Sequence, residues 1–330
     1  MQKWNSGIAG LLGAVTLGLA SAPGGAAITK EMVNQARFKK TVRASKRVQP
    51  LLIKAQVLLE RALVSPGIID GRYSANTRKA IRVYQQRKSL PVTSVLDANT
   101  WKALASQGND PVLGTYKITQ GDVNGPFLKK IPQDVRQMAK LDRLSYTSPK
   151  ELLAERFHMS EALLKTLNPG ANFKKPGTTL VVARVSDQKP SSQVHSIVID
   201  KRAQAVKGYD QNGKLVVFYP ATIGSAQFPS PSGNLKVTAV AENPTFTLTS
   251  KLKYAKLKKG QVITVPAGPN SPVGATWISL SKPGYGIHGT AHPELIRQRE
   301  SHGCVRLTNW DARELAHLVH KGVPVRFAGK

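Results

Sequence analysis

The spacing of apolar residues divides the chain into a helical first part and a strand-rich last part. Between residues 48 and 107, apolar side chains recur every three or four positions, which predicts three short amphipathic helices. Ser74 and Asp97 precede two of these runs and are favourable N-cap residues. From residue 193 onward, short runs bounded by turn residues predict strands instead. We therefore expect a multidomain α+β protein that begins with a small three-helix bundle.

The last part, residues 193–330, is predicted to be a mainly-β domain of the sandwich or barrel kind. Its first three strands should form an antiparallel meander, with a turn at residues 210–213. Thr308 and Asp311 resemble a capping box at the start of one C-terminal helix, which Gly322 ends. The expected strands cover residues 196–200, 205–209, 215–219, 234–240, 277–280, 286–288 and 324–327.

Residues 108–187 mix the two patterns. A strand is expected around Tyr116, helices follow, and a turn at Asn168-Pro169-Gly170 leads to a closing strand near Val182. Two polar segments, residues 28–47 and 188–192, are expected to be linkers. The middle of the chain is thus predicted to be a separate α/β module.

The first 27 residues are typical of a secretory signal peptide. Lys3 precedes an apolar run from Ile8 to Ala20, and small residues lead to an expected cleavage site near Ala27. The run is shorter than the roughly 20 residues that span a bilayer, although an uncleaved anchor stays open as the alternative. We predict export to the periplasm and no stable membrane anchor after cleavage.

The chain is strongly basic. It has 48 Lys and Arg against 19 Asp and Glu, a formal net charge of +29 in 330 residues. Such a charge favours polyanionic partners, such as nucleic acid, anionic lipid or an acidic cell-wall polymer. Nucleic acid is not expected, because no basic reading element with interleaved aromatic residues is found.

Cys304 is the only cysteine and the first candidate for chemistry. His302 lies two positions before it and His288 sixteen positions before it. A lone thiol beside imidazoles in an exported protein is typical of a nucleophile with a base, because the thiolate is the reactive form. A zinc site built from His288, His292, His302 and Cys304 is the alternative. Gly289 and Pro293 place the histidine pair on a loop, so we expect no metal and no cofactor.

Residues 193–330 resemble the catalytic domain of L,D-transpeptidases of the YkuD type. The motifs that carry the resemblance are Thr222-Ile223-Gly224, Pro231-Ser232-Gly233, Gly268-Pro269-Asn270-Ser271-Pro272-Val273-Gly274, Gly286-Ile287-His288-Gly289-Thr290 and Ser301-His302-Gly303-Cys304-Val305-Arg306-Leu307. The resemblance implies a cysteine acyl-enzyme that cleaves the diaminopimelate–D-alanine bond of peptidoglycan tetrapeptide stems. Transfer to an amine acceptor would then form 3-3 cross-links, and carbapenems are expected to acylate the same thiol.

The same resemblance implies roles for single residues. Cys304 would be the nucleophile, His288 the proton donor and acceptor, and the Gly303 backbone part of an oxyanion site. A backbone carbonyl near Gly289 would orient the imidazole, because no carboxylate follows His288 in the motif. His302 would shape the pocket, or be structural. Residues expected to bind substrate are Arg306, Gly289, Thr290 and Ser301.

Residues 48–107 resemble a peptidoglycan-binding domain, on the pieces Ile69-Asp70-Gly71, Thr77-Arg78-Lys79-Ala80-Ile81 and Leu90-Pro91-Val92. Residues 108–187 resemble a LysM module, although a simple spacer is an equal alternative. Both resemblances imply glycan and stem peptides as partners. Alternative functions are an L,D-carboxypeptidase, an enzyme that attaches an outer-membrane protein to the wall, and a non-catalytic wall-binding scaffold. The lysine-rich residues 251–259 are expected to be a solvated loop or a rim of the cleft.

Overall fold

The computed structural model describes residues 27–39, 42, 47–185, 192–250 and 257–329. The expected signal peptide, apart from Ala27, lies outside these residues. So do most of the second linker and Lys251, Lys253 and Lys256 of the lysine-rich segment. Among the described residues, no helix is both long and apolar enough to cross a membrane.

Three helices occupy the region where three were predicted: α2 (Pro50–Arg61), α3 (Ala75–Arg87) and α4 (Ala98–Ala105). Ser74 accepts a hydrogen bond from the Thr77 backbone and Asp97 from that of Thr100, as N-caps do. Buried Leu, Ile and Ala side chains fill the space between the helices, with the fully buried Tyr84 as the largest. The apolar residues that recur every three or four positions thus form the inner faces of these helices.

Part of the expected first linker is folded, which corrects the prediction. Residues 30–34 form α1 (Lys30–Asn34), capped by the Thr29 hydroxyl. Val33 is fully buried, and the Asn34 side chain exchanges two hydrogen bonds with the Leu113 backbone, at 3.0 and 2.8 Å. One apolar anchor and one amide are enough to dock a helix that shows no periodicity in the sequence.

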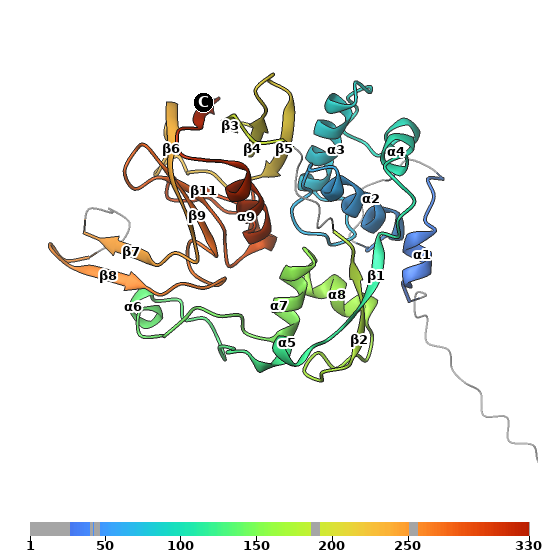
Figure 1. Ribbon diagram of the computed structural model, residues 1–330, viewed down its shortest axis with the longest axis horizontal. Helices are drawn as coiled ribbons and strands as arrows, with labels where there is room; N and C mark the ends of the chain where they lie inside the picture. Colours follow the sequence, from blue (N-terminus) through green and yellow to red (C-terminus); the bar gives the residue numbers. More distant parts are fainter. Residues whose placement is uncertain (1–26, 40–41, 43–46, 186–191, 251–256, 330) are drawn as a thin grey trace, which may run out of the picture.

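The middle module pairs two antiparallel strands, β1 (Leu113–Lys117) and β2 (Thr179–Ala183). The helices between them are α5 (Gln120–Asn124), α6 (Val135–Met138), α7 (Pro149–Arg156) and α8 (Glu161–Leu167). Thr119 and Asp122 form a reciprocal capping box on α5. α6 lies apart from the others and packs against the hairpin of the next domain, as Figure 1 shows.

The C-terminal domain is mainly β, as predicted. Its eight-stranded sheet has the order β11-β10-β9-β6-β12-β3-β4-β5, and α9 (Asn309–Leu318) packs against β9 and β10. The strands are β3 (Ser196–Asp200), β4 (Ala205–Tyr209), β5 (Leu215–Pro220), β6 (Gly233–Glu242), β9 (Thr276–Leu280), β10 (Gly286–His288), β11 (Val305–Arg306) and β12 (Pro324–Ala328). The meander β3–β4–β5 is antiparallel as expected, whereas β12–β3 and β10–β11 are parallel.

A second, separate hairpin was not predicted. It pairs β7 (Phe246–Thr249) with β8 (Val262–Val265). Leu248, Ile263 and Val265 form a small core with Leu144 of the middle module. The middle module therefore contacts the C-terminal domain at this hairpin, and also where α7 packs against α9 (Figure 1).

Candidate active site

Cys304 directly precedes β11, and the residues of that strand define the site. β10 and β11 are parallel, with His288 opposite Arg306 and Ile287 opposite Val305. Side chains opposite each other on paired strands lie on one face of the sheet, so Arg306 shares a face with His288. The charge of Arg306 acts on both His288 and Cys304, which places the thiol close to the same guanidinium. The pairing of two short strands brings the predicted nucleophile, base and cation together.

A network of serine hydroxyls fixes the loop that carries the thiol. Ser301 is buried, its hydroxyl donates to the Cys304 carbonyl at 2.5 Å, and it accepts from the Gly303 N–H at 3.2 Å. The Ser230 hydroxyl donates to the Gly303 carbonyl at 2.8 Å and accepts from the Gly224 N–H at 2.9 Å. Ser230 was not among the predicted site residues. Its partners lie 6 and 73 positions away, so no local pattern marks it.

Gly303 has the conformation that its motif suggests, but its N–H is already used. Its φ of +108° lies in the region that favours glycine, and a Cβ there would come 2.8 Å from the Tyr285 ring. Because its N–H donates to Ser301, the oxyanion role predicted for Gly303 requires that weak bond to be given up. The Ser301 hydroxyl makes both of its hydrogen bonds inside the loop. This favours a role in holding the loop and not the predicted contact with substrate.

His288 is a buried, oriented and neutral imidazole. Its side chain stacks on Trp277, with the ring centroids 5.4 Å apart, and Nδ1 lies 2.7 Å from the Gly289 carbonyl. A carbonyl only accepts, so Nδ1 carries the proton, and the neutral ring keeps Nε2 as its basic atom. Burial lowers the pKa of His288 to about 3, helped by the Arg306 charge and opposed by backbone contacts at Gly289 and Val273. The backbone carbonyl expected as orienting group is therefore that of Gly289 itself.

The Cys304 thiol is partly buried and protonated at rest. Its Sγ lies 3.5 Å from the Gly284 carbonyl, which accepts the weak S–H bond. Burial raises the pKa of the thiol, and a backbone contact at Gly286 and the charge of Arg306 oppose this rise. In the described part of the chain the thiol makes its hydrogen bond to this carbonyl and not to His288. Proton transfer to His288 therefore requires the weak S–H bond to Gly284 to be given up when substrate binds, since catalytic hydrogen bonds are often not formed in resting sites.

Arg306 supplies the positive field of the site. Its backbone exchanges two 2.9 Å hydrogen bonds with Thr222, which fixes the strand on its outer side. Burial lowers the pKa of His288 and of His302, and the charge of Arg306 adds to this, whereas at Cys304 the same charge opposes the rise that burial causes. A guanidinium that acts on all three groups is well placed to attract the carboxylate of an incoming substrate, which is the role predicted for Arg306.

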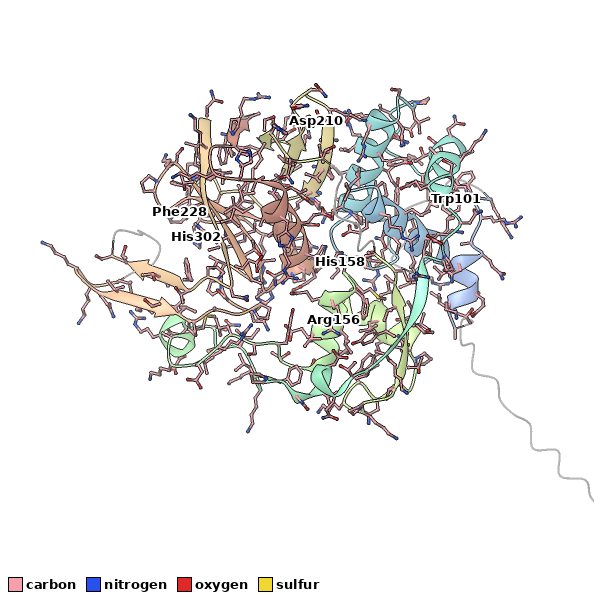
Figure 2. All side chains as sticks on the ribbon, in the orientation of Figure 1. Trp101, Arg156, His158, Asp210, Phe228 and His302 are labelled. Atoms are coloured by element: carbon pink, nitrogen blue, oxygen red, sulfur yellow. The ribbon has the colours of Figure 1, made fainter. Side chains whose placement is uncertain are left out.

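His302 belongs to the loop that carries the thiol, and its ring contacts Phe228. It is exposed and makes an edge-to-face contact with Phe228, with centroids 5.0 Å apart, and Figure 2 labels this pair. Desolvation and the charge of Arg306 lower the pKa of His302. The shaping role expected for His302 stays a prediction.

Thr290 and Arg306 meet at a small cavity of about 60 Å³, together with Thr222 and Arg299. Thr290 is buried, and its backbone N–H donates to the Asn309 side chain at 3.1 Å. Gly289 contributes only its backbone, because a Cβ there would collide with Asn309. Of the four predicted substrate-binding residues, Arg306 and Thr290 thus reach a cavity, whereas Gly289 and Ser301 organise the backbone.

The residues of the alternative zinc site do not form a cluster of donors in the described part of the chain. In the part of the chain that the structure describes, no three His, Cys, Asp or Glu side chains gather as ligands of one ion. His292 faces Glu294 at 3.4 Å instead, and that carboxylate raises the pKa of His292. His288 and His292 therefore have different partners, the Gly289 carbonyl and the Glu294 carboxylate.

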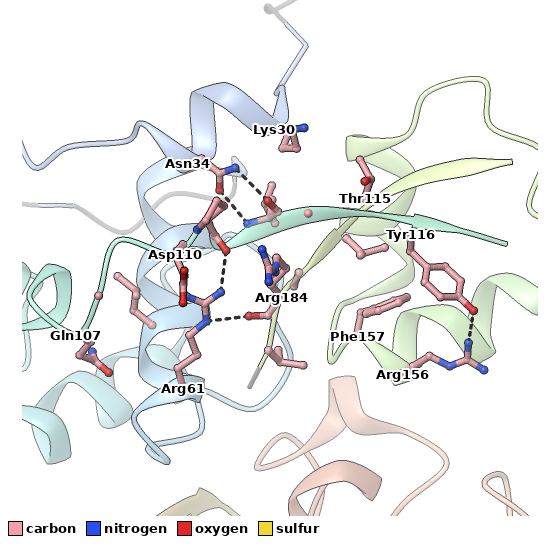
Figure 3. Close-up of a pocket in the computed structure, with 18 residues that line it drawn as sticks. Lys30, Asn34, Arg61, Gln107, Asp110, Thr115, Tyr116, Arg156, Phe157 and Arg184 are labelled. Carbon is pink, nitrogen blue, oxygen red and sulfur yellow. Dashed lines mark hydrogen bonds between the residues drawn. The ribbon is translucent and has the colours of Figure 1, made fainter. Parts of the chain in front are cut away.

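A larger groove, of about 990 Å³, lies between the N-terminal helices and the middle module (Figure 3). Tyr116 and Phe157 line one side, and Arg184 is exposed on its wall. Arg61 closes the bottom by donating to the carbonyls of Asp110, Pro111 and Arg184. The groove combines aromatic faces with positive charge.

Comparison with known protein families supports the two resemblances found in the N-terminal and C-terminal parts of the sequence. Residues 195–326 match the model of the L,D-transpeptidase catalytic domain family YkuD, and residues 49–104 match that of a peptidoglycan-binding domain family.

Three relatives extend the likeness of the C-terminal part. The chain is 28% identical to YkuD of Bacillus licheniformis over 177 residues, which cover 53% of this chain and 90% of that protein. It is 31% identical to YbiS of Escherichia coli, over 55% of this chain and 60% of that protein, and 32% identical to ErfK/SrfK of Salmonella typhimurium, over 54% and 59%. All three are named as L,D-transpeptidases. The chain thus spans about 60% of the two enterobacterial relatives. L,D-transpeptidase 3 of Mycobacterium tuberculosis aligns at 14% identity over 47% of this chain and 76% of that chain, with a TM-score of 0.34.

Proposed function

We propose that this chain, which carries an L,D-transpeptidase catalytic domain and a peptidoglycan-binding domain, is an exported enzyme that forms 3-3 cross-links in peptidoglycan. The observation that carries the proposal is the pairing of β10 with β11, which sets Arg306 opposite His288 and has Cys304 directly before β11, inside the segment that matches the catalytic family. The reaction begins on a tetrapeptide stem, at the bond between diaminopimelate and the terminal D-alanine.

In the first half-reaction the Cys304 sulfur attacks the carbonyl carbon of the diaminopimelate residue. His288 accepts the thiol proton at Nε2 and passes it to the leaving amine of D-alanine, so that the C–N bond breaks as the thioester forms. The Gly289 carbonyl keeps the ring oriented, because it holds Nδ1 at 2.7 Å. Arg306 holds a stem carboxylate near the thiol.

In the second half-reaction an amine of a second stem attacks the thioester carbonyl. His288 removes a proton from that amine and returns it to the sulfur, so that a new amide bond forms and the thiol is released. The backbone N–H of Cys304 is the preferred donor to the developing oxyanion, since that of Gly303 already serves Ser301. Carbapenems are expected to stop the cycle by acylating Cys304.

The two preceding modules are proposed to hold the enzyme on the wall. The N-terminal helices match a peptidoglycan-binding family. The antiparallel strands β1 and β2, with α7 and α8 between them, support a LysM-like middle module with inserted residues before α7. The groove between the two modules offers aromatic faces for sugars and the exposed Arg184 for a stem carboxylate (Figure 3). A signal peptide in residues 1–27 would place the chain in the periplasm.

The test is incubation of the mature protein with sacculi that contain tetrapeptide stems, followed by mass spectrometry of the digested muropeptides. Dimers linked between two diaminopimelates support the proposal. Tripeptides alone would indicate an L,D-carboxypeptidase, and a stem joined to a protein lysine would indicate a protein-attaching enzyme. The Cys304→Ala variant must lose every one of these products, and full activity in it would refute the mechanism. If neither the wild type nor the variant changes the sacculi, the result would indicate a non-catalytic binding scaffold.

A further inference from the structure

Asn309 connects the catalytic histidine's loop to a different module of the chain. It is the first residue of α9 and is 1% exposed. Its Oδ1 accepts from the backbone N–H groups of Ala275 and Thr290, both at 3.1 Å. The fit leaves no space beside it, because a Cβ at Gly274 or Gly289 would come 2.1 Å from this oxygen. The amide oxygen therefore holds together the two loops that flank His288.

The other end of the same amide is held by the middle module. Asn309 Nδ2 donates to both carboxylate oxygens of Glu155 on α7, at 3.1 and 3.0 Å, and to the Pro269 carbonyl at 3.1 Å. The amide thus uses acceptor and donor atoms in opposite directions, and its orientation is fixed by partners of opposite kind. Glu155 is itself fixed, because Tyr146 donates to it at 2.8 Å.

A second carboxylate on the same face of α7 holds the neighbouring loop. Glu151 lies one helical turn before Glu155 and accepts from Asn270 Nδ2 at 2.7 Å. Asn270 also donates to the Ser145 carbonyl at 3.0 Å. The Leu144 carbonyl packs directly against Gly268, because a Cβ there would collide with it. Together these contacts show that residues 144–155 pack along the loop from 268 to 275. This loop contains Val273, whose backbone contacts the His288 ring.

From these contacts we infer that α7 is a built-in positioning element of the active site, in which Glu155 acts through Asn309 to set the imidazole of His288. The path has three short steps. Glu155 holds Asn309, Asn309 holds the Gly289–Thr290 backbone, and the Gly289 carbonyl holds Nδ1 of His288. Glu155 lies outside the segment that matches the catalytic family, so the middle module is required for the rate of the reaction as well as for binding. The inference rests on the proposed role of His288 as base.

The first test compares three full-length variants with the wild type by their rate of acylation with imipenem, followed by mass spectrometry of Cys304. Glu155→Ala should slow acylation by about 10- to 100-fold, since a shift of about 1 Å in a reacting group has effects of this size. Glu155→Gln should retain most of the rate, because its amide oxygen still accepts from Asn309. Glu161→Gln on α8 is the matched control, because its carboxylate pairs with Lys150 and not with this network; it should react as the wild type does.

A double-mutant cycle separates this role from general loss of structure. In a His288→Ala background, adding Glu155→Ala should change the remaining acylation rate less than twofold, because the group that Glu155 positions is gone. An equal loss in both backgrounds would overturn the inference. So would wild-type rates in Glu155→Ala. If the wild-type chain itself is not acylated, the proposed function fails instead, which is a different outcome.

Exchanging the amide and the carboxylate between Asn309 and Glu155 gives a rescue test that does not depend on shortening a side chain. Asn309→Asp places two carboxylates against each other and should lose acylation and lower the melting temperature. Adding Glu155→Gln restores a donor opposite the new carboxylate, and at least tenfold of the lost rate should return. In steady-state assays with tetrapeptide stems, Glu155→Ala should lower kcat with KM changed less than threefold. A rise in KM alone would contradict positioning of His288.

Discussion

The Cys304 thiol is expected to be protonated in the resting enzyme at neutral pH. Burial raises the pKa of the thiol above its ordinary value, while burial and Arg306 lower the pKa of His288 to about 3. At pH 7 the imidazole is about 4 pH units above its pKa, so protonating it in the free enzyme costs about 5 kcal/mol, at 1.36 kcal/mol for each unit. The raised pKa of the thiol acts in the same direction. The surroundings of both groups therefore disfavour a preformed thiolate–imidazolium pair.

The assay is alkylation by iodoacetamide between pH 5 and pH 9. Cys304 is the only cysteine, so the rate reports this thiol alone. The thiolate is the reacting species, so the rate should rise about tenfold per pH unit through pH 8 without a plateau. The His288→Gln variant should show the same slope, because the ring carries no charge in this range. A plateau below pH 7 in the wild type, lost in that variant, would mean an ion pair and would refute the reasoning.

Three further predictions concern the supports of the site. Gly303→Ala places a methyl group 2.8 Å from Tyr285 at a φ of +108°, and should cost about 1–3 kcal/mol in urea unfolding and slow acylation by imipenem. Ser230→Ala removes the bonds to Gly224 and Gly303 and should cost about 1–3 kcal/mol, with Ser232→Ala as the control. Glu314 accepts from Tyr219 at 2.7 Å, and burial raises its pKa to about 7. The folded state thus binds this proton more tightly than the unfolded state, so stability falls as pH rises from about 4.5 to 7, by up to about 3 kcal/mol. Glu314→Gln should remove much of this fall in unfolding curves at pH 5 and pH 8, and an unchanged pH dependence would contradict the assignment.

The sequence predicted the strands of the sheet and the face of the site because both follow local patterns. Alternating apolar residues located β3, β4 and β5, and the glycine-bounded runs located β10 and the loop before β11. The absence of a carboxylate after His288 pointed to a backbone carbonyl, and Gly289 provides it at 2.7 Å. These features depend on neighbours within a few residues, which a single sequence displays.

The missed features depend on partners that are distant in the chain. Asn309 and Glu155 are separated by 154 positions, and neither stands in an unusual local pattern. Ser230 bonds a carbonyl 73 residues away. The helix α1 buries only Val33, so it shows no amphipathic period. The N–H of Gly303 was expected to face substrate, but the conformation of the loop turns it toward Ser301, which only coordinates can show.

The low basicity of His288 and the field of Arg306 together link substrate recognition to proton transfer. In the free site, burial and the guanidinium both disfavour a charged imidazole. Burial is a fixed property of the fold, whereas the effect of Arg306 is cancelled when a substrate carboxylate pairs with it. A stem carboxylate paired with Arg306 would therefore raise the pKa of His288 and make the imidazole a better proton acceptor. The same pairing would raise the pKa of Cys304, because the charge of Arg306 opposes the rise that burial causes there. Under the proposed mechanism, substrate binding thus keeps the thiol neutral while it makes the imidazole more basic, so the proton moves as the sulfur attacks and not before.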